Sequence, residues 1–270
     1  MSKKMTQDEI NKLPSVTMGR RDILRGLAAG TVIPLVVAGC ETSDGLGSAL
    51  VSDAQIQQAS QAAWVEAQQR ERRSTNARYN SQVQRVGQRI VQASGQTQHA
   101  WEFVVFESPQ RNAWVLPNGK VAFYTGLLDV MENDDQVATV MGHEVGHLAR
   151  RHATQRARRQ ASAGLGLAII NAGLGAAGVQ NADTWAGILG TGVQYGVILP
   201  YSREHELEAD QLGVQYMAAG RYNPVEALRF WQTLSAQGGR APAELLSTHP
   251  SSSTRMQALS SQLRGMGYTV

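Results

Sequence analysis

Apolar and polar residues follow two different patterns along this chain. Over most of its length apolar side chains recur every three to four residues, which is typical of helices that bury one face. We predict helices over residues 53–73, 76–93, 134–160, 203–219, 223–236 and 254–263, and a further helix that begins near residue 125. Strand-like runs cover residues 101–106, 113–116 and 121–124, with a hairpin turn at Pro117-Asn118-Gly119-Lys120. The pattern predicts an α+β fold, a mainly helical single domain with a small antiparallel sheet.

The charge of the chain is concentrated at its N-terminus. The 270 residues carry a formal net charge of +3, and residues 1–39, with six basic and three acidic side chains, account for all of it. The rest is formally neutral and gives no electrostatic reason to expect a nucleic-acid partner. A charged stretch precedes the uncharged run 26–39, which is too short to span a bilayer. A charged region followed by a short apolar region is the order found in signal peptides. The Arg20-Arg21 pair resembles that of a twin-arginine export signal.

The single cysteine, Cys40, ends the sequence Val37-Ala38-Gly39-Cys40, which resembles a bacterial lipoprotein box. The alternative is a buried structural cysteine after a short hydrophobic anchor. We expect a lipid thioether at Cys40 to hold the protein to a membrane, because several acyl chains together give stable attachment. Glu41 after the cysteine favours the outer membrane over the inner one, by resemblance to bacterial lipoprotein sorting.

These features predict three parts. Residues 1–39 are a lipoprotein signal peptide, residues 40–52 are the lipidated cysteine and a tether, and residues 53–270 form one domain. Within that domain, residues 164–200 are rich in glycine and alanine and carry Asp183 as their one charge. We predict a flexible, weakly helical flap there. A membrane hairpin is less favoured, because glycines and polar residues interrupt the apolar run.

The strongest candidate chemistry lies in His143-Glu144-Val145-Gly146-His147, within the helix predicted over residues 134–160. A spacing of four residues stacks two imidazoles on one helix face, where both can bind one metal ion. Glu144 lies beside that face and is placed to take a proton from water. Surface histidines on an ordinary helix would be the alternative, but the chance occurrence of this pattern in a chain of this length is small.

A third ligand is predicted on the helix at residues 203–219. The pattern of the gluzincin metallopeptidases, which this motif resembles, has a glutamate ligand followed four residues later by an aspartate that can orient a ligand histidine. Glu206 and Asp210 have that spacing, whereas Glu204 and Glu208 form a second pair with no aspartate four residues on. Two other histidines are assigned no ligand role. His152 is expected to point away from the shared face, and His205 lies about 100° around its helix from Glu206.

Together with Thr248-His249-Pro250 and Arg255, these motifs resemble the gluzincin zinc metallopeptidases of the CaaX prenyl protease and HtpX type. The resemblance covers about residues 75–265. Within the family the chain is most similar to LoiP/BepA-like periplasmic lipoprotein peptidases, because we expect neither membrane-spanning helices nor helical repeats after the catalytic domain.

The resemblance implies one zinc ion per chain, bound by His143, His147 and Glu206 beside the small sheet. It also implies that Glu144 is the general base and that Asp210 supports a ligand histidine. His249 is expected near the metal, where it can close the open position in a latent state, and Arg255 is expected close by. Either residue could stabilise the oxyanion.

The expected function is zinc-dependent hydrolysis of peptide bonds in misfolded or misassembled envelope proteins. Substrate is expected to add as a strand beside residues 112–116, starting at Asn112 and Ala113. The alternatives are a non-catalytic assembly factor or chaperone with a latent zinc site and a peptidase that acts on murein. The sequence contains no signal for the oligomeric state.

Overall fold

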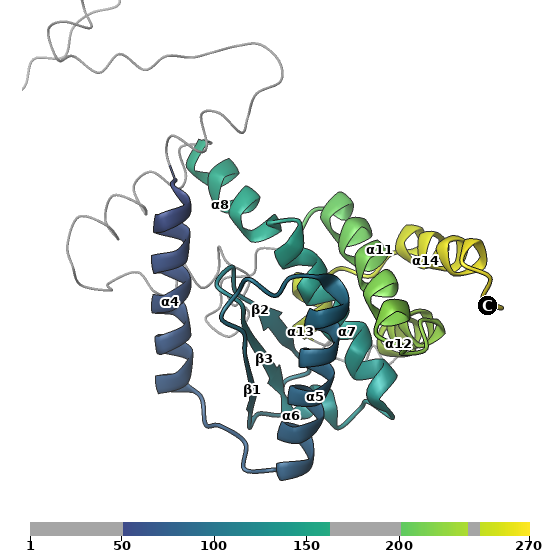
Figure 1. Ribbon diagram of the computed structural model, residues 1–270, viewed down its shortest axis with the longest axis horizontal. Coiled ribbons are helices and arrows are strands. Elements are labelled where there is room, and N and C mark those ends of the chain that lie inside the picture. The colour runs from purple at the N-terminus through teal and green to yellow at the C-terminus, as the bar shows by residue number, and fades with distance from the viewer. Residues whose placement is uncertain (1–50, 163–200, 237–243) are drawn as a thin grey trace, which may run out of the picture. The chain divides into compact units, whose positions relative to one another are not determined.

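The computed structural model describes residues 51–162, 201–236 and 244–270 (Figure 1). The predicted export segment, Cys40, nearly all of the tether and the predicted flap at 164–200 lie outside the described residues. In the part of the chain that is described, no helix is long and apolar enough to cross a membrane.

Helices make up most of the described chain. They are α4 Asp53–Arg70, α5 Ala77–Ser94, α6 Thr125–Leu128, α7 Asp134–Ala149, α8 His152–Ser162, α11 Arg203–Ala219, α12 Val225–Ala236, α13 Glu244–Thr248 and α14 Ser253–Gly265. The strands are β1 Glu102–Phe106, β2 Ala113–Val115 and β3 Lys120–Tyr124. The predicted α+β class, mainly helical with a small sheet, is confirmed. The short helix α13 was not predicted.

The sheet has the strand order β1-β3-β2 and is mixed, not purely antiparallel as predicted. β2 and β3 form the predicted hairpin, and Gly119 in its turn has a φ of 82°, which favours glycine. β1 pairs with the other edge of β3 in the parallel direction. The turn residues indicate the hairpin locally, whereas the direction of β1 depends on packing against distant helices, which the sequence pattern does not encode.

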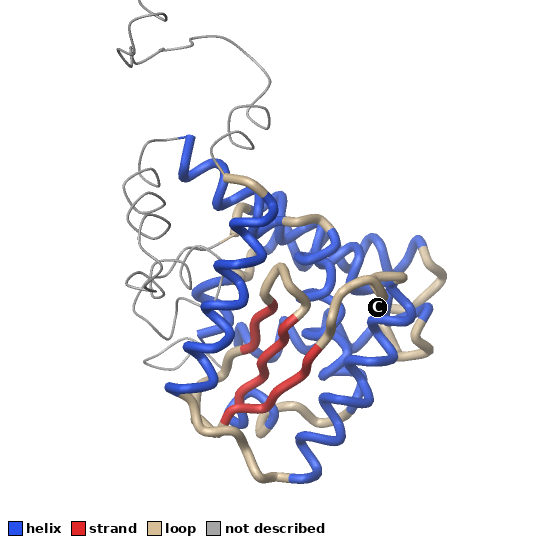
Figure 2. Tube along the Cα trace, turned by 60° about the vertical axis from the view of Figure 1, so that its left-hand side comes forward, coloured by secondary structure: helices blue, strands red, loops and turns tan. Residues whose placement is uncertain are grey.

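Both faces of this sheet are covered, because successive strand residues point to opposite sides. Val105, Val121 and Phe123 belong to the main hydrophobic core, to which α5, α7, α11, α12 and α14 contribute. Phe106 and Trp114 instead pack with residues of α4 and α8 in a second cluster. Figures 1 and 2 show α4 on one side of the strands and α5 and α7 on the other. The sheet therefore stands between α4 and the helix that carries the histidine motif.

The prediction of one continuous helix over residues 134–160 is wrong. Asn133 caps α7 by accepting a hydrogen bond from the backbone N–H of Gln136, and α7 ends at Ala149. Arg151 then adopts a φ of 56°, in the left-handed region, before α8 begins at His152. A non-glycine residue in this conformation breaks the helix and redirects the chain. The Arg151 side chain forms an ion pair with Asp53 of α4.

Candidate metal centre

Helix α7 presents His143, Glu144 and His147 to the interior. All three side chains are at most 2% exposed. The same helix places Val137, Val140 and Val145 in the main core, with no exposed surface. Burying these apolar residues fixes the rotation of α7, because each fully buried valine contributes about 1.5 kcal/mol or more. The position of the two histidines follows from that rotation.

Helix α11 crosses α7 with its backbone in direct contact. Ser202 caps α11 by accepting a hydrogen bond from the backbone N–H of His205. A Cβ atom added at Gly142 would lie 3.0 Å from the carbonyl oxygen of Gly213, and one at Gly146 would lie 2.9 Å from that of Ala209. These glycines permit the close approach that brings Glu206 and Asp210 to the histidines of α7.

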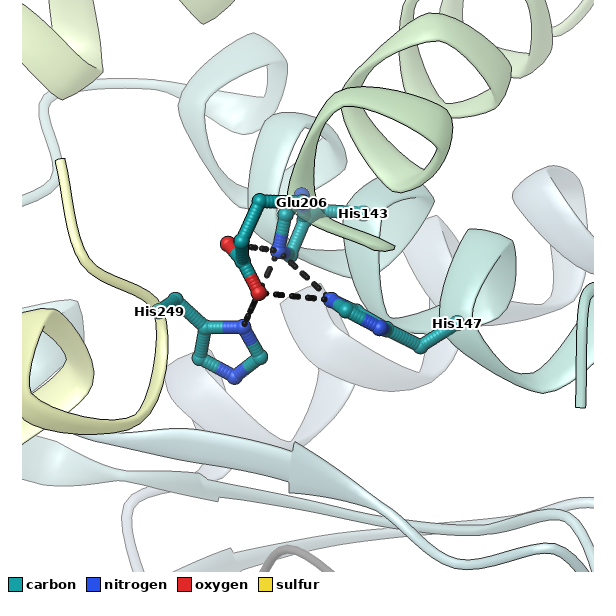
Figure 3. A group of neighbouring side chains, drawn as sticks. All are labelled: His143, His147, Glu206 and His249. Carbon is teal, nitrogen blue, oxygen red and sulfur yellow. Dashed lines mark hydrogen bonds and ion pairs between the residues drawn. The ribbon is translucent and has the colours of Figure 1, made fainter. Parts of the chain in front are cut away.

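Four donor side chains converge where these helices meet: His143, His147, Glu206 and His249 (Figure 3). One ligand atom from each can be chosen so that all lie within 4.8 Å of one another. His143 Nε2 lies 3.0 Å from His147 Nε2 and 3.1 Å from His249 Nδ1. Glu206 Oε1 lies 3.1 Å from His249 Nδ1 and 3.4 Å from His147 Nε2. The structure thus brings the three predicted ligands together and adds His249 as a fourth neighbour.

Behind His143 lies a buried charged network. Asp210 Oδ1 is 2.9 Å from His143 Nδ1 and accepts a hydrogen bond from it. Arg255 donates to both oxygens of Asp210, at 2.7 Å from Nε and 2.8 Å from Nη2. Its Nη1 lies 2.8 Å from Glu206 Oε2 and also donates to the carbonyl oxygen of His249. Arg255 thereby connects α14 to α11 and to the segment that carries His249.

Glu144 lies next to the cluster without belonging to it. Its Oε1 atom is 3.4 Å from His249 Nε2 and has no hydrogen-bond partner among the described residues. Burial raises the pKa of Glu144, while the neighbouring His249 and His143 and a backbone hydrogen bond from Val115 act to lower it. A buried carboxylate with a raised pKa and an unengaged oxygen is suited to accepting a proton.

Comparison with known proteins decides which family this site belongs to. The family model described as "Peptidase family M48" matches residues 77–263, which is more than half of the chain. This chain belongs to peptidase family M48. The match runs from the start of α5 into α14 and includes every residue of the M48 site described above, whereas α4 precedes it.

Individual relatives agree with the family match. The chain is 31% identical over 179 residues to "Mitochondrial metalloendopeptidase OMA1" of Schizosaccharomyces pombe, covering 66% of this chain and 51% of that protein. It is 36% identical over 160 residues to the protein of the same name in Arabidopsis thaliana, covering 59% and 31%. It is 28% identical over 181 residues to "Beta-barrel assembly-enhancing protease" of Escherichia coli, covering 64% and 37%. The chain thus spans about half or less of these relatives' lengths.

The donor set of this M48 site fits zinc, the metal of the family. In neutral His143, whose Nδ1 donates to Asp210, Nε2 carries a lone pair that points at two other imidazoles. Lone pairs directed at one point repel each other unless a cation lies between them. Ligands about 2.0 Å from a tetrahedral zinc ion lie about 3.3 Å apart, which matches the spacings between these atoms.

The electrostatics of the M48 site also favour a cation. Burial lowers the pKa of His143, but hydrogen bonds to Asp210 and Glu206 outweigh burial and raise it to about 9. Burial raises the pKa of Glu206, but His249 and hydrogen bonds from the histidines lower it well below its usual value. Glu206, 1% exposed, is thus ionised within the cluster, and Asp210, 5% exposed, is ionised behind His143, so both carboxylates favour a positive charge at the centre.

The remaining predicted residues lie around this centre. Asn112 and Ala113 are each 1% exposed at the start of β2, the edge strand beside α7. A cavity of about 420 Å³ lies at the end of β2, and Leu116, His147 and Ile56 are among the residues that line it. Glu208, the alternative carboxylate on α11, does not join the four-residue cluster. Cys40 lies outside the described residues.

Sequence reasoning missed the environment of His147. His152 was expected to point away, but its Nδ1 lies 2.9 Å from His147 Nδ1. The Tyr201 ring stacks on His147 with centroids 4.0 Å apart. Burial, with a contribution from His205, lowers the pKa of His152 to about 4. The helix break at Arg151 causes the difference, and an arginine there gives no local signal for a left-handed conformation.

Proposed function

We propose that this protein is a zinc-dependent endopeptidase. The observation that carries the proposal is the buried group of His143, His147 and Glu206, with Glu144 beside it and unengaged on one oxygen. Structural zinc sites are usually closed by cysteines, whereas sites of histidine and carboxylate ligands with an open position are typical of hydrolases. In this proposal the three residues hold one zinc ion and Asp210 orients His143.

Bound zinc supplies a Lewis acid that polarises a peptide carbonyl and activates water. Glu144 accepts the proton of the attacking water as the new carbon–oxygen bond forms. It then delivers that proton to the amide nitrogen as the carbon–nitrogen bond breaks. The guanidinium of Arg255 is engaged by Asp210, Glu206 and backbone oxygens, which favours a role in holding the ligands over contact with the oxyanion.

The proposal includes a resting state in which His249 blocks the site. Its Nδ1 lies 3.1 Å from both His143 Nε2 and Glu206 Oε1, at the place in the cluster where a water molecule or substrate carbonyl would bind. Cleavage then requires His249 to move away from the cluster. This arrangement supports the latent state expected from the resemblance, and it is the one observation that favours the non-catalytic alternative.

Unfolded polypeptide is the substrate class that the surroundings of the site support. The strand order leaves β2 at the edge of the sheet, and a substrate strand can add to such an edge through backbone hydrogen bonds. Val115 and Leu116 line the 420 Å³ cavity together with His147, so a chain held along β2 would lead to the metal centre. Recognition through the backbone tolerates varied side chains, which suits removal of misfolded proteins.

The cellular setting is also part of the proposal. We place the protein in the bacterial envelope as a periplasm-facing lipoprotein, exported by the twin-arginine route and anchored through Cys40 in the outer membrane. The LoiP/BepA-like subtype is favoured, and one relative is named for enhancing β-barrel assembly. Palmitate labelling of the wild type and of Cys40→Ala tests the anchor, and continued labelling of the variant would reject it.

The peptidase is tested with Glu144→Gln in the full-length chain. The variant should bind one zinc ion per chain and should lose casein cleavage by at least about 100-fold, because general acid–base catalysis contributes 10²–10⁴-fold. Glu204→Gln is the matched control, since it makes the same change at an exposed position of α11. A zinc-replete Glu144→Gln protein with full activity would reject the assignment.

The same assay separates the alternatives. Cleavage of purified murein without cleavage of casein would favour the murein-directed peptidase. A wild type that is inert on both substrates, with and without His249→Ala, would favour the assembly factor. Substrates that co-purify with the Glu144→Gln chain would identify the natural target.

A further inference from the structure

The two ring nitrogens of His147 have different partners. Nε2 faces the cluster, 3.0 Å from His143 Nε2 and 3.4 Å from Glu206 Oε1. Nδ1 faces the opposite way and lies 2.9 Å from Nδ1 of His152. Two imidazole nitrogens at this distance share one hydrogen bond, in which one ring donates and the other accepts. The direction of that bond determines which nitrogen of His147 is available to a metal.

Glu208 determines the direction. Its Oε2 atom lies 3.1 Å from His152 Nε2, and an ionised carboxylate can only accept. His152 therefore carries its proton on Nε2 and has a lone pair on Nδ1. His147 donates its Nδ1 proton to that lone pair, and its Nε2 is left unprotonated toward the cluster. The chain of hydrogen bonds runs from His147 through His152 to a carboxylate that is 48% exposed.

The helix break is what brings His152 to this position. On an uninterrupted helix, a residue five positions after His147 lies about 140° around the axis from it. Arg151, with its φ of 56°, ends α7 and turns His152 back toward His147. The His152 ring is fully buried and stacks on His205, with centroids 4.1 Å apart and an interplanar angle of 15°. Burial and stacking fix the ring in the orientation that the hydrogen bond requires.

We propose that His152 is a positioning residue that fixes the tautomer and the orientation of His147 for zinc, with Glu208 as its anchor. The inference rests on the proposed function, because it takes His147 as a zinc ligand. Partners of this kind orient ligand histidines and raise their basicity. The alternative hypothesis is a purely structural role, in which His152 only fills space in the ring stack.

Substitutions of His152 separate the two roles. His152→Phe keeps an aromatic ring for the stack but has no acceptor, whereas His152→Asn places an amide oxygen near the position of Nδ1. His205→Phe is the matched control, because His205 belongs to the same stack and makes no hydrogen bond to the four cluster residues. All variants are made in the full-length chain.

Three measurements are made on each variant. Zinc affinity comes from competition with a chromogenic chelator, and the absorption spectrum of the Co²⁺ form reports the ligand geometry. The melting temperature in excess chelator reports the stability of the metal-free protein. We expect His152→Phe to weaken zinc binding about 10–100-fold and to shift the Co²⁺ spectrum, with a melting temperature close to that of His205→Phe. His152→Asn should restore affinity to within roughly threefold of the wild type.

Several results would overturn the proposal. They are wild-type zinc affinity in His152→Phe, equal losses in the Phe and Asn variants, or an equal loss in His205→Phe. Failure of the proposed function gives different results. Wild-type zinc affinity in His147→Ala would reject the ligand set itself. A protein that binds zinc and cleaves no substrate would reject the peptidase. If its zinc affinity still fell as expected in His152→Phe, the positioning role would be supported.

Discussion

The two histidines of the motif are supported by different neighbours, and the two supports differ in kind. His143 is held on the deep side, which we define as Asp210 and Arg255, both at most 5% exposed and joined by two hydrogen bonds. His147 is held on the rim side, which we define as His152 and Glu208, a neutral ring and a half-exposed carboxylate.

The difference indicates that the two supports are connected to two different properties, the stability of the fold and the binding of the metal. Buried charges must remain paired, so the deep side links the ligands to the stability of the whole fold. The hydrogen bonds on the rim side join a neutral ring to a half-exposed carboxylate, so we expect breaking them to weaken metal binding more than it weakens the fold. Substitutions at three positions, in order of decreasing effect, test this contrast.

Asp210→Ala should have the largest effect. It leaves the guanidinium of Arg255 buried without its bidentate partner, and breaking such a pair typically costs about 3–5 kcal/mol. Urea unfolding in the presence of a chelator measures this loss independently of the metal. Asp210→Asn keeps the shape and one acceptor and should lose less. A loss below about 1 kcal/mol in the alanine variant would show that the deep side does not stabilise the fold.

Glu208→Gln should have an intermediate effect, which lowers zinc affinity and leaves the stability of the fold nearly unchanged. The amide oxygen still accepts a hydrogen bond from His152, so zinc affinity should fall by less than about 10-fold. Because the carboxylate is 48% exposed and its ion pair with Arg150 is long, at 3.8 Å, the free energy of unfolding should change by no more than about 0.5 kcal/mol. A loss of stability comparable with that of Asp210→Ala would remove the distinction between the two sides.

Arg151→Gly should have the smallest effect. Glycine adopts a φ of 56° without strain, so the turn that directs His152 is kept and zinc affinity should equal that of the wild type. Arg151→Ala, which also loses the ion pair with Asp53, retains the strained conformation and should be about 1 kcal/mol less stable than the glycine variant. Thermal unfolding compares the two. Weakened zinc binding in Arg151→Gly would show that the arginine side chain, and not the backbone turn, positions His152.

The deep side was largely predictable from the sequence, because its parts follow regular helix spacing. His143 and His147 are four residues apart, as are Glu206 and Asp210, and both pairs lie on helices whose apolar faces are evident. Arg255 was expected nearby only through resemblance. Its contact with both Asp210 and Glu206 depends on how α14 packs, which no local pattern encodes.

The rim side could not be predicted, because it depends on a break in that regularity. The spacing from His147 to His152 indicates opposite helix faces, and it fails only because Arg151 leaves the helix. The parallel pairing of β1 was missed for a similar reason, since the hairpin signal between β2 and β3 carries no information about the third strand. Regular elements were predicted well, and the irregular connections that complete the site were not.

The backbone contact between α7 and α11 has a consequence for protein design. Gly142 lies against Gly213, and Gly146 lies against Ala209, so no side chain separates the two helices at the level of the ligands. A designer who copied the five-residue motif and the glutamate–aspartate pair onto another helical scaffold would place the donors too far apart if the helices kept the usual axial distance of 8–10 Å, with side chains between them. The transferable unit is therefore the pair of touching helices with its small residues, and the ligands alone do not define it.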